Sequence, residues 1–475
     1  MSLLDDFVAA LRGNANVDLT SGDVGRPLFF LSLPIVVTNL LQTAYNLADT
    51  FWLGQYSTEA LAAISFAFPM VFLLISLGMG VSVAGSVIVA QHAGAGEERE
   101  AEYAASQTVT FALVIAVVLG VVGYFLVGPF LALLGASDAV LPGATDYMQI
   151  ISLGLVAMFG FWVFVSLMRG YGDTVTPMLV MFGSVVLNIV LDPFVIFGWG
   201  PFPRLGIAGA AYATVFSRSL ALIVGLAIMY SGTRGVRIRP SEMLPDREYV
   251  KRIVGIGAPA SVEMTGRALS VNLLLFVVGT FPTTVVAAFG IGTRVFSVIF
   301  LPAIAVARGV ETMTGQNIGA GKPDRAAEAT KTAAVAMFVI LSAAGVVAFV
   351  GARPIADIFT DDPAVIDVTA SFLHYVAPTF GFIGVMRAYS GSFRGAGKTL
   401  TAAAIAITML AVVRLPVAWF GAQILDSPDG IWLAFTVSNV VGAVLAYAWY
   451  QRGTWRDADV RGSPLADDVA DSAGD

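Results

Sequence analysis

The chain repeats itself. Two stretches that lie 225 positions apart share residues without a gap between them. The first stretch carries Pro34, Phe51, Gly54, Thr58, Ala62, Ala63, Val81, Gln91, Gly94, Ala95 and Gly96, which recur as Pro259, Phe276, Gly279, Thr283, Ala287, Ala288, Val306, Gln316, Gly319, Ala320 and Gly321. The same offset relates Arg169, Gly170, Gly172, Thr174 and Thr176 to Arg394, Gly395, Gly397, Thr399 and Thr401. The sequence therefore predicts two copies of one unit, each about half the chain.

The two copies differ in their polar residues. Three aligned pairs show the difference most clearly: Asp49 with Leu274, Gln42 with Arg267, and Thr38 with Glu263. A shared framework is therefore expected to hold different polar groups in each half.

The composition indicates a membrane protein. Hydrophobic residues make up 57% of the 475 residues and charged residues only 12%, whereas a soluble domain has about 25% charged residues. We predict an all-α polytopic fold, because apolar runs of about 20 residues are long enough to cross a hydrocarbon core of about 30 Å as helices. The twelve predicted spans lie near 28–52, 60–90, 106–133, 147–168, 178–198, 207–230, 253–280, 285–312, 333–351, 368–391, 402–424 and 430–450.

The positions of Lys and Arg predict the orientation. Eighteen of the 26 basic residues fall in the loops and tails on the side of the N-terminus, and only Arg204 and Arg353 fall in loops on the other side. Cytoplasmic loops are rich in Lys and Arg, so we expect both termini in the cytoplasm of a cell-membrane protein. The remaining six basic residues lie inside spans: Arg218, Arg267, Arg294, Arg308, Arg387 and Arg414.

An even number of spans per copy makes the second copy enter the membrane in the same sense as the first, so we expect parallel repeats around a central cavity. The predicted domains are a cytoplasmic N-terminal segment (1–26), an N-lobe of six spans (27–231), a cytoplasmic basic linker (232–252), a C-lobe of six spans (253–451) and an acidic, disordered cytoplasmic tail (452–475).

The first span carries polar residues on one face. Gln42, Tyr45 and Asp49 are spaced at i, i+3 and i+7. An ionised carboxylate is costly at membrane depth, so Asp49 either faces water or a partner, or it binds protons and cations. The alternative is an interfacial Asp that caps the helix end near Gly54.

The fifth span carries a second polar face. Asn188 and Asp192 are one turn apart, and Pro193 removes the amide hydrogen that would bond the carbonyl of Ile189. Amide, carboxylate and carbonyl oxygens are ligands that alkali cations accept, and Asp192 lies at a depth similar to that of Asp49. The alternative is that Asp192 is a local cap beside a kink.

The second copy is polar in the opposite sense. Glu263 with Arg267 and Arg308 with Glu311 are spaced for intrahelical ion pairs, so their expected role is mutual neutralisation. Arg294 and Arg414 have no partner of this kind on their own helices.

No enzyme is predicted. His92 and His374 are single, the chain has no cysteine, and no nucleophile with a nearby base is recognisable. The run Gly397, Lys398, Thr399 has Ser392 where a phosphate-binding loop needs glycine.

These motifs resemble the multidrug and toxic compound extrusion family over residues 27–452. The resemblance lies in the run from Pro34 to Gly54, the Gln-x-x-Gly-Ala-Gly loops at Gln91 and Gln316, the Arg-Gly-x-Gly turns at Arg169 and Arg394, and the group Asn188, Asp192 and Pro193. The chain looks most similar to the DinF-like branch, because Arg267 stands where the NorM-like branch has an acidic residue.

The resemblance implies alternating access of two six-helix lobes and export of cationic or amphipathic compounds against inward sodium or protons. It implies a cation or Na⁺ site at Asp49, Asn188, Asp192 and Thr214, and a substrate cavity at Gln42, Tyr45 and Met181. Apart from the coupling ion and the lipid bilayer, we expect no cofactor, no nucleic acid and a monomer.

Three other readings stay open. A lipid-linked oligosaccharide flippase of the same superfamily would favour a cationic cavity, which the arginines of the second copy allow. A major-facilitator transporter would need a basic loop that is missing at 91–106. An ion channel is the alternative from a different class.

Overall fold

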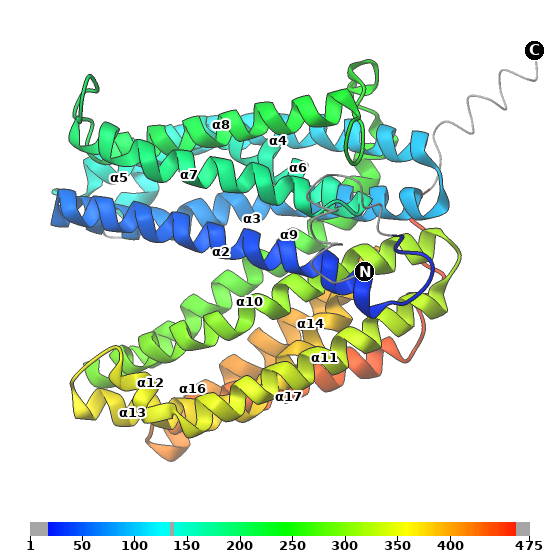
Figure 1. The fold of residues 1–475 in the computed structure, drawn as a ribbon. Coiled ribbons are helices and arrows are strands. Elements are labelled where there is room, and N and C mark those ends of the chain that lie inside the picture. The colour runs from blue at the N-terminus through cyan, green and yellow to red at the C-terminus, as the bar shows by residue number, and fades with distance from the viewer. Residues whose placement is uncertain (1–17, 134–136, 462–475) are drawn as a thin grey trace, which may run out of the picture. The chain divides into compact units, whose positions relative to one another are not determined.

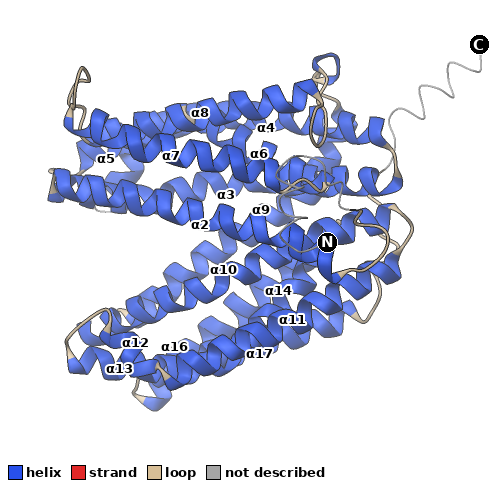
Figure 2. Ribbon diagram, in the orientation of Figure 1, coloured by secondary structure: helices blue, strands red, loops and turns tan. Residues whose placement is uncertain are grey.

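The computed structural model describes residues 18–133 and 137–461, and every regular element in these ranges is a helix (Figure 2). The first repeat contains α2 (Gly25–Tyr56), α3 (Thr58–Ala95), α4 (Glu98–Leu133), α5 (Leu141–Leu153), α6 (Leu155–Tyr171), α7 (Val175–Phe197) and α8 (Ile207–Ser231). The linker between the repeats contains the 3₁₀ turn η1 (Pro240–Glu242). The second repeat contains α9 (Arg247–Val278), α10 (Thr283–Gly319), α11 (Pro323–Val350), α12 (Ala352–Asp357), α13 (Pro363–Val376), the 3₁₀ turn η2 (Ala377–Thr379), α14 (Phe380–Gly395), α15 (Thr399–Ile407), the π-helix η3 (Thr408–Arg414), α16 (Leu415–Leu425) and α17 (Asp429–Tyr450). The all-α prediction is confirmed.

The predicted number of spans is also confirmed. Eleven helices in the described part of the chain are long and apolar enough to cross a membrane, and α5 and α6 together make a twelfth span that bends by 53°. The sequence predicts this span as one apolar run over 147–168. The bend lies at Gly154, where a Cβ atom would come within 2.3 Å of the side chain of Val215 on α8. Close packing against α8 therefore explains both the glycine and the break.

The second repeat has an irregularity of its own at η3. Pro416 has no amide hydrogen to give to the helix, and the amide of Leu415 instead donates to the carbonyl of Leu410, five residues earlier. π-Segments of this kind occur frequently at functional sites. Arg414 is the last residue of this segment.

Contacts divide the chain into two compact units. Unit 1 contains Leu33–Ser261, and unit 2 contains Asp18–Ser32 and Val262–Val460. The helices that begin the two repeats, α2 and α9, therefore each start in one unit and end in the other (Figure 1). The predicted lobe boundaries differ, because they assign 27–32 to the N-lobe and do not group the linker or 253–261 with the first repeat.

Small residues allow these helix beginnings to pack closely. In unit 1, a Cβ atom on Gly80 of α3 would lie 2.2 Å from the carbonyl oxygen of Gly257 on α9. In unit 2, a Cβ atom on Gly309 of α10 would lie 2.6 Å from the hydroxyl of Ser32 on α2. Ser32 and Gly257 are equivalent under the repeat of 225, so the two crossings are related.

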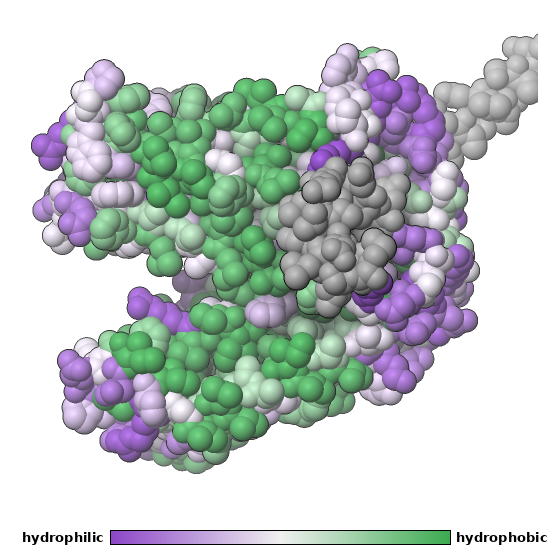
Figure 3. Space-filling view, viewed as in Figure 1, coloured by the Kyte–Doolittle hydropathy of each residue, from purple (hydrophilic) through white to green (hydrophobic). Residues whose placement is uncertain are grey.

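The sides of the helices are apolar in each unit, and polar residues gather at the helix ends (Figure 3). Large apolar side chains such as Phe125 and Phe276 are exposed. A soluble protein rarely exposes apolar surface over whole helices, so these faces are suited to lipid.

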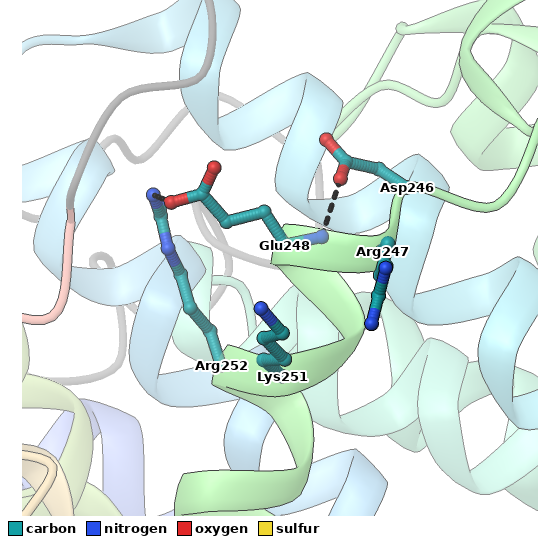
Figure 4. A pocket seen from close by; sticks show the side chains of 5 residues that line it. All are labelled: Asp246, Arg247, Glu248, Lys251 and Arg252. Carbon is teal, nitrogen blue, oxygen red and sulfur yellow. Dashed lines mark hydrogen bonds and ion pairs between the residues drawn. The ribbon is translucent and has the colours of Figure 1, made fainter.

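The linker between the repeats is fixed to α4. The amide of Gln107 donates to the carbonyl oxygens of Glu242 (2.6 Å) and Leu244 (2.7 Å), and Tyr103 donates to Asp246 (2.8 Å). Asp246 also accepts from the amide of Glu248 at the start of α9. An open pocket of about 550 Å³ lies at the start of α9 and is lined by Asp246, Arg247, Glu248, Lys251 and Arg252 (Figure 4).

The first part of the tail that is predicted to be disordered is folded. Trp455 is buried, stacks on Tyr450 at 4.5 Å and donates its indole N–H to the carbonyl of Tyr450. This aromatic stacking fixes the segment after α17, so residues 452–461 belong to the folded protein. The rest of the predicted tail lies outside the described residues.

Candidate functional site

Three helices of unit 1 bring the predicted ion-binding residues together. Asp49 comes from α2, Asn188 and Asp192 lie one turn apart on α7, and Thr214 lies on α8, which packs along α7 (Figure 1). All four side chains are buried. Asp49 is therefore not an interfacial helix cap, and α7 continues through Pro193.

The two carboxyl groups lie close enough to repel each other. Neither oxygen of Asp49 has a hydrogen-bond partner, and the same is true of Oδ2 of Asp192 and Oδ1 of Asn188. The amide of Asn188 donates to Oδ1 of Asp192 at 3.3 Å. Buried polar atoms are nearly always hydrogen-bonded, so these oxygens without a donor are in a place where a proton or a cation would be stabilised.

Arg218 on α8 is the positive charge beside this pair. Its guanidinium donates to Oε1 of Gln42 at 2.8 Å and to the sulfur of Met181 at 2.9 Å, and it lies 5.1 Å from the ring of Tyr45. It is also attracted by Asp49. The three residues expected to line a substrate cavity, Gln42, Tyr45 and Met181, thus all contact one buried arginine.

Thr214 is tied to the first helix. Its hydroxyl lies 2.6 Å from the hydroxyl of Tyr45, which is itself buried. This bond holds α8 against α2 beside Asp49. Thr214 therefore positions α8 beside Asp49, and its role as an ion ligand stays a prediction.

The charge balance of the site calls for one more positive charge. Asp49 and Asp192 would supply two negative charges if both were ionised, and Arg218 supplies one positive charge. A single Na⁺ ion or proton would make the buried group neutral. The carboxylate, amide and hydroxyl oxygens are hard ligands of the kind that suit such an ion. The described residues contain no group of three His, Cys, Asp or Glu that would hold another metal.

Unit 2 contains a buried network of glutamates and arginines. The intrahelical pairs Glu263–Arg267 (3.5 Å) and Arg308–Glu311 (2.8 Å) are present as the spacing predicts. Arg394 on α14 joins them, with its guanidinium 3.2 Å from Glu263 and 3.1 Å from Glu311. Arg394 and its counterpart Arg169 are among the eighteen basic residues expected in inner loops and tails. Both are instead buried at helix ends, because each packs into its own repeat.

The remaining arginines of unit 2 differ in environment. Arg414 is buried and bonds to Ser438 and Asn439, while Arg387 lies 4.3 Å from the ring of Phe300 with its Nε unbonded. Arg294, grouped with Arg414 by sequence, is exposed on α10.

Sequence reasoning therefore missed Arg218, Arg387 and Arg394 as members of these two sites. The available signal was their position: Arg218 and Arg387 lie inside spans, where charged residues are rare and functional.

Comparison with known proteins agrees with this architecture. The sequence model of the MatE family matches residues 34–194 and 259–420, so it matches each repeat once from the aligned prolines onward. The chain therefore belongs to the MatE family. Members of this family are transporters, so the protein is a multi-pass membrane transporter and not an enzyme.

Two relatives in sequence extend over nearly the whole chain. A protein named FAD transporter from Shewanella oneidensis is 29% identical over 91% of this chain and 96% of its own. The probable multidrug resistance protein YoeA of Bacillus subtilis is 27% identical over 90% and 94%.

Solved structures are similar as well. The outward-facing conformation of a multidrug resistance MATE transporter has a TM-score of 0.85 at 25% identity, with 92% and 97% of the two chains covered. A transporter of the MOP superfamily from Pyrococcus furiosus has a TM-score of 0.82 at 25% identity over 94% and 99%, and it is described as having a binding pocket of reverse polarity that suggests a different function.

We predict that Na⁺ stabilises the protein through Asp192. A ligand present at 100 times its Kd stabilises the folded state by about 2.7 kcal/mol, so replacing choline by sodium is expected to raise the Tm by several degrees. Asp192→Asn removes a ligand charge while keeping its shape, and it should abolish this sodium-dependent increase, as followed by tryptophan fluorescence in detergent.

The matched control is Asp173→Asn. Asp173 caps the other end of α7 by accepting from the amides of Val175 and Thr176, so its loss is expected to lower the Tm without changing the response to sodium. A full sodium response in Asp192→Asn would exclude this residue from the ion site.

Proposed function

We propose that the protein is a secondary active exporter that moves cationic or amphipathic organic compounds out of the cytoplasm in exchange for Na⁺ or H⁺. The observation that carries the proposal is the buried group of two carboxyl groups, Asp49 and Asp192, beside the single guanidinium group of Arg218. Burial of an uncompensated charge costs several kcal/mol, so the group favours a state with one bound cation.

We expect Na⁺ and H⁺ to compete for the same carboxylate oxygens. Protonation of Asp49 or Asp192 removes the negative charge that holds sodium, so a proton and a sodium ion exclude each other. Arrival or release of the cation changes the balance of attraction between α2, α7 and α8, which carry the charged residues. A two-state transporter needs a bistable element of this kind, whose equilibrium the ion shifts.

The names of the relatives support organic substrates. A probable multidrug resistance protein and an FAD transporter are among them. Asp49 on α2 together with Arg267 in the acidic position of α9 also supports assignment to the DinF-like branch. An oligosaccharide flippase or a channel is less well supported, because neither needs a neutralisable carboxylate pair.

Ion-driven transport is the decisive test. Proteoliposomes loaded with a fluorescent organic compound should lose it faster when a sodium or proton gradient is imposed, and the rate should saturate with substrate. Asp49→Asn keeps the shape of the side chain but cannot be ionised, so we expect the gradient-driven rate to fall at least about tenfold, a barrier increase of about 1.4 kcal/mol.

Asp362→Asn is the control, because Asp362 is exposed and caps α13 by accepting from the amide of Ala364. It should transport like the parent. Unsaturable flux, or equal rates with and without either gradient, would indicate a channel. Parent-like transport by Asp49→Asn at every pH would refute the role given to this carboxylate.

We also propose that both termini and the linker face the cytoplasm of the cell membrane. Two exposed serines test this orientation in the cysteine-free chain: Ser241 in the linker and Ser137 between α4 and α5. An impermeant thiol reagent added to intact cells should label Ser137→Cys and leave Ser241→Cys unlabelled. The reverse pattern would overturn the orientation.

A further inference from the structure

Unit 2 contains a cavity of about 390 Å³ that the ion-coupling scheme does not use. Helices α9, α10, α14 and α17 form it together with η3. Four phenylalanines line it: Phe289, Phe296, Phe300 and Phe435. The polar residues of the lining are Arg267, Thr293, Ser297, Arg414 and Asn439.

Arg414 is the notable member of this lining, because it is buried without a carboxylate. Its Nε donates to the hydroxyl of Ser438 at 2.8 Å and its Nη2 donates to Oδ1 of Asn439 at 2.9 Å, so neutral groups alone hold it among the described residues. The charge that acts on it is that of Arg267, which repels it. The side chain is only 8% exposed, and its guanidinium carbon lies 4.2 Å from the ring of Phe435.

Arg267 does not remove this excess of positive charge. Its partner Glu263 is shared with Arg394, which is bound through both carboxylate oxygens at 3.2 and 3.3 Å. Four arginines of the buried network (Arg267, Arg308, Arg387 and Arg394) face two glutamates (Glu263 and Glu311). A buried excess of positive charge beside a cavity favours an anion in that cavity.

The repeat shows that this cavity is the counterpart of the ion site. Several lining residues are equivalent to residues around Arg218 and Asp49 in the first repeat: Arg267 to Gln42, Leu274 to Asp49, Met386 to Phe161, and Asn439 to Thr214. The second repeat has lost the carboxylate at this place and gained two guanidinium groups. The same framework therefore presents opposite charge in the two halves.

We propose that this cavity of unit 2 binds an organic anion that joins an aromatic body to a carboxylate or phosphate group, and that such anions are export substrates. The second statement rests on the proposed exporter function. The phenylalanines provide faces for an aromatic body, and the planar forks of Arg267 and Arg414 match the oxygens of a carboxylate or phosphate. The volume lies near the lower end of the range of about 300–1,000 Å³ for small-molecule sites, which suits a single aromatic compound better than a lipid-linked oligosaccharide.

The test uses two fluorescent probes with one aromatic body. Flavin mononucleotide and riboflavin share the ring system and differ by the phosphate. Binding to the purified protein in neutral detergent is followed by fluorescence anisotropy. We expect flavin mononucleotide to bind at least about tenfold more tightly than riboflavin, because hydrogen bonds between charged groups are the stronger ones.

Arg414→Gln is expected to weaken binding of flavin mononucleotide by about tenfold or more and to leave riboflavin unchanged. Arg414→Lys keeps the charge and should restore part of the preference. Arg294→Gln is the matched control, because Arg294 lies in the same unit but is exposed and does not line the cavity. An intact sodium response of the Tm shows that each variant is folded.

Three results would overturn the proposal: equal binding of the two flavins, equal losses in Arg414→Gln and Arg294→Gln, or tighter binding of the aromatic cation tetraphenylphosphonium in competition. Loss of flavin mononucleotide binding when phosphatidylglycerol replaces phosphatidylcholine in the micelles would assign the site to a lipid headgroup instead. Phosphate-selective binding without any gradient-driven transport would retain the anion site and reject the exporter function. Gradient-driven transport without phosphate selectivity would retain the exporter function and reject the anion site.

Discussion

Charge neutrality inside a low-dielectric environment is the constraint on which this protein depends. A soluble protein can leave an ionised group in water, but the spans of this chain place Asp49, Asp192 and Arg218 where water is scarce and the cost of an unbalanced charge is several kcal/mol. The group reaches neutrality only with one additional cation. The unbonded oxygens of Asp49, Asp192 and Asn188 provide the place where this cation is expected to bind.

The two repeats differ in the charges that they bury at equivalent positions. They are equivalent helical frameworks, and equivalent positions in them differ in charge. Where the first repeat has Asp49 the second has Leu274, and where the first has Gln42 the second has Arg267. One half is thereby suited to a coupling cation, and the other holds arginines beside an aromatic cavity. On the proposed function, this division would place the coupling ion and the organic anion in different halves of the protein.

Much of the fold was predictable because helices in a membrane follow simple rules. Apolar runs fix the spans, and a rise of about 1.5 Å per residue places Asp49 and Asp192 at similar depth, which is why their proximity could be anticipated. Intrahelical spacing likewise predicted the pair of Glu263 and Arg267. The break at Gly154 was not predictable, since it depends on Val215 of another helix.

The contacts of Arg218 and Arg394 were missed for the same reason. The partner of Arg218 on α2, Gln42, is 176 positions away, and Arg394 binds Glu263 from a distance of 131 positions. Helical periodicity describes only one face of one helix, so it cannot show which arginine another helix will contribute. The membership of a buried charge cluster depends on packing between helices.

The number of cations bound per protein tests the separation of charge most directly. Equilibrium binding of radioactive sodium to the purified protein should saturate at about one ion per chain and decline as the pH is lowered. Addition of flavin mononucleotide should weaken sodium binding only up to a limiting value, because the exchanged anion acts from the other half and does not occupy the ion site. Saturation at two ions, or competitive displacement of sodium that grows without limit as the flavin is added, would contradict the account.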